Sequence, residues 1–415
     1  MTVKLFEFFA GIGSQYKALK NISKYKNWLI QHVGMVEWFI DAIIAYVCIH
    51  SKNFKPTKSP LKDFYSLSMD SKSELSYKGL IKLNNSFKSS YLNYSQEYFN
   101  NLFNIEKITY KNIPKNIDIL TYSFPCQDLS VQGLQKGIDK KLKTRSGLLW
   151  EVERILIEIF NNFKTEEMPK YLLMENVKNL LNKTNKKNYQ LWINQLKKLG
   201  YESKTYVLNS KNFNSAQSRE RVFCLSVRKD FQDKVKFNFI DFKPLKKFKI
   251  LQDILKENIN YEYIDLSNFE TTNWITSRNG VISKKILNWS NFNSENYIYS
   301  ENGVGPTLTA SGANSRIKIE TNKGVRYMSS LECYQYMGFS ESDYLKVKNS
   351  NLVSDTKLIY TAGNSIPVQV LECLFATLKF SENDDQTYIY IEIRVLKVFM
   401  FLLRQKDTLK IKIVN

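Results

Sequence analysis

Short apolar runs alternate with amphipathic stretches along the first 228 residues. Val3 to Phe9 is apolar and aromatic-rich, which predicts a strand, and the spacing of apolar positions from Gln15 to Ile22 predicts a helix. The same patterns predict further strands over 33–36, 117–123, 171–174, 206–208 and 222–227, and further helices over 41–49, 146–160 and 188–199. Strands that alternate with helices predict an α/β fold, with a parallel sheet covered on both faces.

The pattern changes near residue 229. Residues 229–325 are polar and rich in Asn and Lys, with short aromatic runs and Gly-containing turns, which indicates a second, less regular domain. A helical pattern returns over 329–337, and a predicted strand over Tyr360 to Gly363 leads into a helix over Val368 to Leu378. Residues 52–100 have weak periodicity and receive no assignment, and the tail over 383–415 has apolar stretches too short to span a bilayer.

The charge changes this picture more than the rest of the composition does. Among 415 residues, Lys and Arg number 60 and Asp and Glu number 40, and the net charge of +20 favours nucleic acid or an anionic membrane surface as a partner. An A/T-rich genome, which favours Lys codons, is a plainer explanation of part of the excess. No transmembrane helix or signal peptide is expected. Five scattered cysteines and only two histidines argue against a disulfide framework and against a metal site, and favour a cytosolic protein.

A glycine turn follows the first predicted strand. In Phe9-Ala10-Gly11-Ile12-Gly13, the glycines let the backbone approach a nucleotide-like ligand closely. Glu37 ends the next strand, where its carboxylate can accept hydrogen bonds from ribose hydroxyls, and Trp38 beside it can stack on an adenine. The turn lacks the third glycine of the dinucleotide fingerprint, so a plain strand-to-helix turn remains an alternative.

Four further motifs lie at predicted strand ends or before a helix. Cys126 follows a strand in a Pro-constrained turn and can act as a nucleophile if its pKa is lowered. Glu175 can act as a general acid if burial raises its pKa. Arg219 and Arg221 are two apart on a predicted strand, so they face one side and can grip a phosphate or a base oxygen. The turn Gly363-Asn364-Ser365 can complete a cofactor pocket. Each motif has a plain alternative: a buried cysteine, a helix cap, a charged edge and a capping turn.

Together, these motifs in this order resemble the bacterial DNA (cytosine-5)-methyltransferase family. The resemblance covers about residues 3–380, through the FAGIG turn, Glu37-Trp38, the PCQ cysteine, the ENV glutamate, the QxRxR arginines and the GNS turn, and the run from Arg326 to Phe339 resembles the family's penultimate motif. It implies the Rossmann-like, doubly wound α/β sheet of S-adenosylmethionine-dependent methyltransferases, with a smaller, irregular target recognition domain. The implied limits are a catalytic domain over 1–228, a recognition domain over 229–350, a return into the catalytic domain over 351–382 and an extra tail over 383–415.

The resemblance also implies residue roles. Cys126 would add to C6 of cytosine, Glu175 would hold or protonate N3, and Arg219 would contact the base O2, with Arg221 beside it in the catalytic set; no metal takes part. The cofactor, S-adenosylmethionine, would be held by Phe9, Gly11, Gly13, Glu37, Trp38, Asn104, Ile105, Asn364 and Ser365. Asn104 departs from the family, which usually has Asp at this position, so we expect weakened rather than lost binding.

The implied substrate is double-stranded DNA, from which the target cytosine must be flipped. Gln132 or Gln135 would fill the vacated stack, and Ser311, Arg316 and Lys318 would contact bases or phosphates. The runs over 123–137, 144–151 and 305–319 look like the bacterial CG-specific subgroup, so we expect CG as the target. We also expect a monomer in the bacterial cytoplasm, associated with the nucleoid and with no membrane partner; a companion restriction endonuclease can accompany a protein of this kind.

Two other functions stay open. An RNA cytosine methyltransferase has the same fold, but the long insert between Arg221 and Arg326 is large enough for a DNA recognition domain. A catalytically silent DNA-binding protein would have no need of Cys126, Glu175 and Arg219 together.

Overall fold

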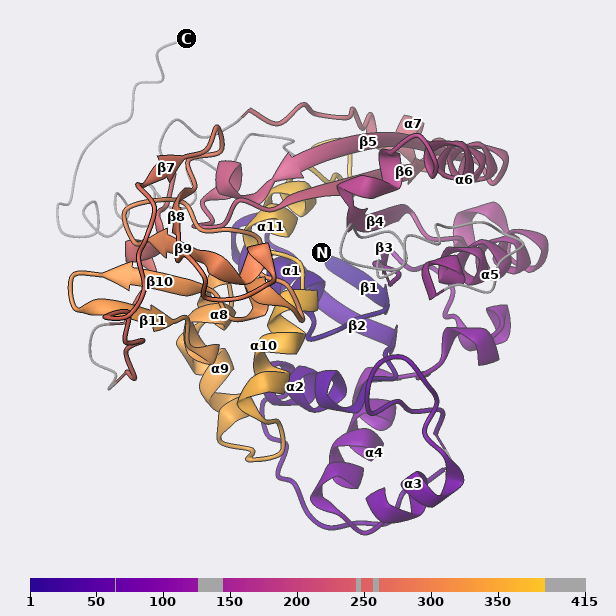
Figure 1. Ribbon diagram of the computed structural model, residues 1–415. Helices are drawn as coiled ribbons and strands as arrows, with labels where there is room; N and C mark the ends of the chain where they lie inside the picture. The colour runs from indigo at the N-terminus through magenta and orange to yellow at the C-terminus, as the bar shows by residue number, and fades with distance from the viewer. Residues whose placement is uncertain (64, 126–144, 244–247, 257–260, 385–415) are drawn as a thin grey trace, which may run out of the picture.

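The computed structural model describes residues 1–63, 65–125, 145–243, 248–256 and 261–384. Its centre is a six-stranded sheet in the order β2-β1-β3-β4-β6-β5 (Figure 1). The strands are β1 (Thr2–Phe8), β2 (Leu29–Val36), β3 (Ile119–Tyr122), β4 (Tyr171–Val177), β5 (Tyr201–Asn209) and β6 (Glu220–Arg228). The α/β fold class predicted from the sequence is confirmed.

The prediction of a wholly parallel sheet is wrong for β6. β1 pairs in parallel with β2 and β3, and β3 with β4, but β6 runs antiparallel to both β4 and β5. Residues 210–219 form a short link from β5 to β6, whereas a parallel pair needs a longer crossover, usually a helix. The sheet is therefore mixed at the edge that carries the QxRxR motif.

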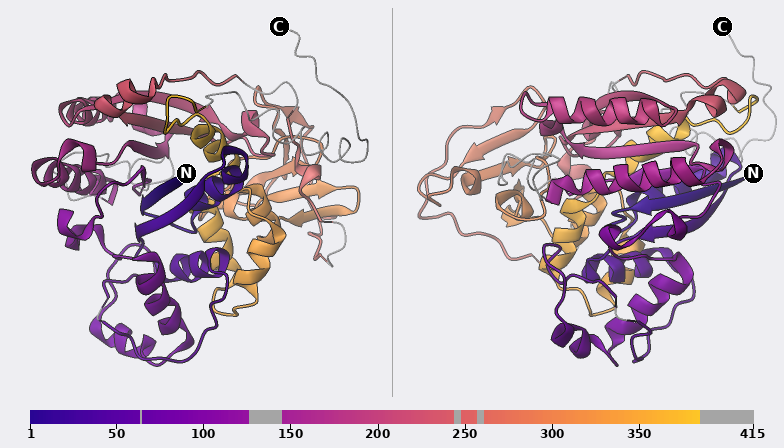
Figure 2. Two further views of the ribbon diagram at one scale, coloured as in Figure 1. Left: turned by 180° about the vertical axis from the view of Figure 1, so that it is seen from behind. Right: turned by 90° about the vertical axis from the view of Figure 1, so that its right-hand side faces the viewer.

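Helices cover both faces of this sheet, as the pattern predicted. One face carries α1 (Ser14–Lys26), α2 (Ile40–His50) and α11 (Val368–Ala376), and the other carries α5 (Leu149–Asn162) and α6 (Lys186–Lys198) (Figure 2). Successive strand residues point to opposite faces, so Leu5 packs in the first core and Phe6 in the second. The two cores bury the central strands β1, β3, β4 and β6 almost fully, and they fix the strand ends that carry the motifs.

The predicted strand at Tyr360 to Gly363 is wrong, because this segment is the last part of helix α10 (Asp355–Asn364). The Ser354 side chain accepts a hydrogen bond from the Lys357 N–H and caps the helix, and Leu358 and Ala362, four residues apart, are buried on one side. The polar residues before Leu358 belong to this helix, so its helical period is visible only over a longer window.

The unassigned stretch from 52 to 100 contains α3 (Tyr77–Leu83) and α4 (Phe87–Phe99), in the lower part of Figure 1. Serine side chains cap both helices, Ser76 for α3 and Ser86 for α4. α4 packs against α2. The capping serines were the available signal in a stretch where the apolar period is weak.

A second, smaller sheet lies beside the first, at the left in Figure 1, in the order β11-β10-β9-β8-β7. Its strands are β7 (Ile275–Thr276), β8 (Ile282–Lys285), β9 (Tyr297–Ser300), β10 (Lys318–Thr321) and β11 (Gly324–Tyr327). A small core of Ile286, Ile298 and Val325 supports it. This matches the predicted smaller and less regular part of the chain.

Two helices follow the small sheet and pack on the larger body. α8 (Ser330–Tyr336) contacts α10, and α9 (Glu341–Lys348) contacts α2. Ser330 Oγ donates to Asp355 at 2.7 Å, and Lys17 Nζ lies 2.7 Å from Asp343. We therefore propose that the smaller domain ends before α8. The remaining short helix, α7 (Lys229–Val235), leads away from β6, and within the described ranges no helix has the length and apolarity needed to cross a membrane.

Candidate active site

The glycine turn after β1 has two glycines with different surroundings. Phe9, Gly11 and Gly13 all have positive φ, of 57°, 57° and 78°. A Cβ at Gly13 would lie 2.2 Å from His50 Nε2, whereas a Cβ at Gly11 would meet no protein atom within 4 Å. Gly13 is therefore required by packing against α2, and Gly11 faces open space that a ligand can approach.

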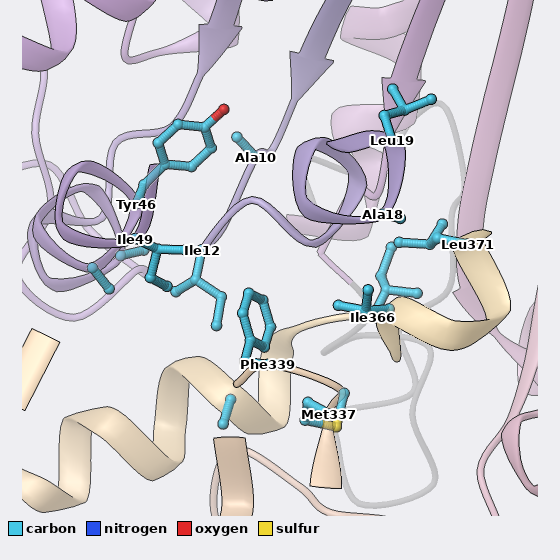
Figure 3. Packing of buried hydrophobic residues seen from close by; sticks show 14 of the residues in the cluster. Ala10, Ile12, Ala18, Leu19, Tyr46, Ile49, Met337, Phe339, Ile366 and Leu371 are labelled. Carbon is cyan, nitrogen blue, oxygen red and sulfur yellow. The ribbon is translucent and has the colours of Figure 1, made fainter. Parts of the chain in front are cut away.

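His50, the last residue of α2, holds this turn by a hydrogen bond. Its Nε2 lies 3.0 Å from the carbonyl oxygen of Ile12, and burial lowers the pKa of the imidazole, so the neutral ring donates this hydrogen bond. In Figure 3, the side chain of Ile12 lies close to Ile49 of α2 and to Phe339, which follows α8. The turn is thus fixed by parts of the chain that are far apart in sequence.

Glu37 faces the same turn from the end of β2. Its two carboxyl oxygens accept hydrogen bonds from the Gly11 and Phe39 N–H groups, each at 2.8 Å. Burial raises the pKa of this carboxyl, while the hydrogen bonds lower it. The Asn101 side chain pairs with both backbone groups of Glu37 at 3.0 Å, a supporting contact that the sequence did not reveal. The carboxyl is therefore held at the open side of the glycine turn.

Three more of the predicted cofactor residues are Asn104, Ile105 and Trp38. Asn104 is buried, its Nδ2 donates to Ser66 Oγ at 2.9 Å, and its Oδ1 accepts from the Glu106 N–H at 3.0 Å, just before Ile105 begins a short 3₁₀ turn. Trp38 is half-buried beside Glu37. Its side chain packs against the first core and is still partly accessible to solvent.

The predicted GNS turn is the end of helix α10, with Gly363 and Asn364 in the helix and Ser365 as its C-cap, and it meets the start of α1. Ser365 Oγ donates to the Ala362 carbonyl at 2.7 Å, and the Ile366 N–H donates to Ser14 Oγ at 3.3 Å. Asn364 is exposed. The open space at Gly11, the half-buried Glu37 carboxyl and the exposed Asn364 amide fit a ligand that carries both a nucleoside and charged groups, so the residues present suit S-adenosylmethionine.

Glu175 lies near the end of β4 and is only 9% exposed. Its Oε1 lies 3.3 Å from Arg221 Nε. Burial raises the pKa of the Glu175 carboxyl, and the charges of Arg221 and Arg219 lower it in part. A carboxyl with a raised pKa keeps its proton to higher pH than an exposed carboxyl does, and it can donate that proton to a base nitrogen.

The neighbouring Asn176 ties this strand to the PCQ turn. Its Nδ2 donates to the Phe124 carbonyl at 3.0 Å, two residues before Cys126 in the sequence. Sequence reasoning gave Asn176 no role, although the ENV motif contained it. Cys126, Gln132 and Gln135 lie outside the described residues.

The two arginines do not share one position or one role. β6 begins at Glu220, so Arg221 is in the strand and Arg219 precedes it. Arg219 is 4% exposed, and its guanidinium donates to the carbonyls of Leu308 at 2.5 Å, Gly363 at 3.0 Å and Ser365 at 3.1 Å. The base contact expected for Arg219 does not agree with this geometry, because the guanidinium is buried and bound to backbone. Arg221 is the arginine that contacts Glu175.

The predicted DNA-contact residues differ in their exposure to solvent. Ser311 is exposed, and so is Arg316, whose Nη2 lies 2.6 Å from Glu295. Lys318 is 2% exposed; its Nζ donates to the Glu295 carbonyl at 2.6 Å and lies over the rings of Trp289 and Tyr327. The side chain of Lys318 is therefore part of the small domain's interior, a position that does not suit the DNA contact predicted for it.

Comparison with known proteins identifies the family of this chain. The family described as C-5 cytosine-specific DNA methylase matches residues 81–379. The chain is 39% identical to the orphan methyltransferase M.SssI of Spiroplasma monobiae, over 90% of this chain and 96% of that one. It is 31% identical to the Type II methyltransferase M2.ScrFI of Lactococcus lactis subsp. cremoris, over 91% and 99%. The crystal structure of the Schizosaccharomyces pombe (S. pombe) Dnmt2 methyltransferase has the same fold, with a TM-score of 0.55 and 16% identity over 90% of this chain and 97% of that one.

Proposed function

This chain belongs to the C-5 cytosine-specific DNA methylases and is a DNA (cytosine-5)-methyltransferase, and from that premise we propose that it methylates cytosine within CG in double-stranded DNA. The observation that carries the catalytic part is the buried Glu175 carboxyl, with its raised pKa, beside Arg221 and one residue before the Asn176 side chain that holds Phe124. This brings an acid, a cation and the backbone entering the PCQ turn to one place.

The proposed reaction begins with the Cys126 thiolate. Its sulfur forms a bond to C6 of the flipped cytosine while Glu175 donates a proton to N3, so C5 gains electron density. S-adenosylmethionine supplies the methyl group that C5 takes up. A base then removes the C5 proton, the C6–S bond breaks, and N3 returns its proton, which regenerates the thiolate and an aromatic 5-methylcytosine.

We assign the arginines by their contacts. Arg221 holds the Glu175 carboxyl and is the arginine placed to contact the base beside it. Arg219 binds three backbone carbonyls and acts at a distance from the base. Both positive charges favour the ionised form of Glu175 once its proton has passed to the base.

The family uses S-adenosylmethionine, and we propose that this chain binds it at the glycine and GNS turns. Gly11 gives the ligand room, the Glu37 carboxyl accepts hydrogen bonds from ribose hydroxyls, and the Trp38 face covers the adenine. Asn104 and Ile105 border the adenine, and Asn364 and Ser365 border the amino-acid end. Phe9 and Gly13 set the backbone course of the turn.

We base the CG assignment on the likeness of the runs over 123–137, 144–151 and 305–319 to the CG-specific bacterial subgroup. In the third run, Ser311 and Arg316 are exposed, and Arg316 can reach DNA once it leaves Glu295. Gln132 or Gln135 would enter the stack that the cytosine vacates. One chain carries both the chemistry and the recognition surface, so we propose that a monomer is sufficient.

A duplex containing 5-fluorocytosine at a single CG tests this proposal. Fluorine at C5 leaves no proton to remove after methyl transfer, so the C6–S bond persists and the protein stays attached to DNA in detergent. We expect this complex with S-adenosylmethionine and the native chain, and none with Cys126→Ala, which should still bind the duplex reversibly. A matched duplex with 5-fluorocytosine in GC should give no complex. A trapped complex with Cys126→Ala would contradict the assignment of Cys126 as the nucleophile. Equal trapping on the CG and GC duplexes would contradict the assignment of CG as the target.

A further inference from the structure

The segment from Gly305 to Ala310 joins the small domain to the larger body through backbone contacts. The Gly305 N–H donates to the Ala216 carbonyl at 2.8 Å, and the Ser218 N–H donates to the Gly305 carbonyl at 2.9 Å. Thr307 Oγ1 donates to the Ser218 carbonyl at 2.7 Å. This segment leads directly to the exposed Ser311.

Two buried side chains of the QxRxR motif hold the middle of this segment. Gln217 Oε1 accepts from the Leu308 N–H at 3.0 Å, and Arg219 Nη1 donates to the Leu308 carbonyl at 2.5 Å. Gln217 is fully buried and Arg219 nearly so. Both backbone groups of Leu308 are therefore fixed by side chains that precede β6.

The same guanidinium also holds the GNS turn. Arg219 Nη2 donates to the carbonyls of Gly363 and Ser365 at 3.0 and 3.1 Å. Gly363 lets the two segments touch, because a Cβ there would lie 2.4 Å from the carbonyl carbon and oxygen of Thr309. One planar group thus binds the segment before Ser311 and the turn before Ile366, which are far apart in the sequence.

We propose that Arg219 is a positioning residue that couples cofactor binding at the GNS turn to DNA binding by the segment after Leu308. This inference rests on the proposed function for the identity of the two ligands. The guanidinium is a rigid fork, so a displacement of one segment changes its bonds to the other. By thermodynamic linkage, a cofactor that orders the GNS turn then raises DNA affinity, and DNA raises cofactor affinity by the same factor.

The variant Arg219→Lys tests the coupling. Lysine keeps the positive charge near Glu175 but carries one compact ammonium group, which cannot bind all three carbonyls in the same geometry. The measurement is the dissociation constant of a CG duplex with and without saturating S-adenosylhomocysteine, the product without a transferable methyl group. We expect roughly tenfold tighter binding with the product in the native chain, a typical size for such coupling, and a ratio near one in Arg219→Lys.

Arg228→Lys is the matched control. Arg228 is also buried, lies at the far end of β6, and donates to the carbonyl of Met168 and to Asp230. It contacts neither Leu308 nor the GNS turn, so its coupling ratio should equal that of the native chain even if its melting temperature falls.

A second variant, Gly363→Ala, approaches the same contact from the opposite side. Gly363 lies in α10 without a positive φ, so alanine suits the helix, but its Cβ would push Thr309 away. We expect a reduced ratio here too, and this variant decides the question if Arg219→Lys fails to fold. A native ratio kept by both variants, or a ratio of one in the native chain, overturns the coupling. Absence of duplex binding by the native chain would instead contradict the proposed function.

Discussion

The buried Glu175 carboxyl can act as a general acid, and its burial also lowers the stability of the folded chain at high pH. Its environment raises the pKa above the ordinary value of 4.5, although Arg221 and Arg219 oppose the shift. The folded chain therefore binds this proton more tightly than the unfolded chain does. As pH rises from 4.5 through the raised pKa, the folded state loses stability relative to the unfolded state.

The variant Glu175→Gln separates these two effects. Glutamine keeps the shape but cannot transfer the proton, so we expect methylation to fall by about 10²- to 10⁴-fold, the usual contribution of a general acid. Because glutamine has no charge to bury, the variant should melt above the native chain at pH 8, and the difference should disappear near pH 4. Calorimetry at the two pH values checks this; a lower melting temperature at pH 8 would mean that the pair with Arg221 outweighs burial.

Asn104 permits a gain-of-affinity prediction. Its Nδ2 is bonded to Ser66, and its Oδ1 already accepts from Glu106, so one acceptor lone pair remains for an adenine amino group. A carboxylate would offer more, and hydrogen bonds to charged groups are stronger by about 1 kcal/mol. Asn104→Asp should therefore bind S-adenosylhomocysteine several times more tightly in titration calorimetry. Weaker binding would show that the amide donor is what the adenine needs.

At the scale of elements, the glycine turn, α2 and the GNS turn form one unit. His50 donates to Ile12, Glu37 accepts from Gly11, and Ser14 accepts from Ile366. Both glycines of the turn have positive φ, but a Cβ would meet His50 at Gly13 and no protein atom at Gly11. A pair of alanine variants can therefore separate packing from ligand binding.

Gly13→Ala should damage the fold, whereas Gly11→Ala should damage binding. Both positions have positive φ, which costs an alanine about 1–2 kcal/mol. At Gly13 the clash with His50 adds overpacking of about 1–3 kcal/mol, and at Gly11 no protein atom is met. Denaturant unfolding should show the larger loss for Gly13→Ala, and cofactor titration should show at least a tenfold loss for a well-folded Gly11→Ala. Equal losses of stability would contradict this division.

The elements also show what a sequence can and cannot predict. Most strands and helices up to residue 228 followed from their periods, because they have a strong apolar pattern; α3 and α4, where the apolar period is weak, did not. The antiparallel direction of β6 did not, since it depends on the short link after β5. The helix α10 was missed because its apolar residues are few and its cap precedes them.

The sequence likewise predicted some features of the site and missed others. Motif order placed Glu37, Glu175 and the GNS turn, and the structure brings the first and third to the glycine turn and the second to Arg221. Which arginine meets the base depends on where β6 begins. The burial of Lys318 depends on Trp289, which is distant in sequence, and on Tyr327, which pairs with Lys318 across two neighbouring strands. Tertiary contacts of this kind have no local pattern.

For the whole molecule, the net charge of +20 implies many contacts of Lys and Arg with phosphates if DNA is the partner. Each phosphate contact contributes about −0.9 to the slope of log affinity against log salt concentration, so six to ten contacts would weaken binding by roughly 10³- to 10⁵-fold between 50 and 200 mM salt. Fluorescence anisotropy with a labelled CG duplex measures this slope. A flat response would mean that the charge is not used on DNA.

Bisulfite sequencing of mixed-sequence, unmethylated DNA tests the central claim most directly. The purified full chain is incubated with this DNA and S-adenosylmethionine, with Cys126→Ala as the control. We predict protected cytosines at CG throughout the DNA, at no other dinucleotide, and none with the control. Protection in another fixed context would contradict the CG assignment, and no protection with the native chain would contradict the account of the site as a cytosine-5 methyltransferase acting on DNA.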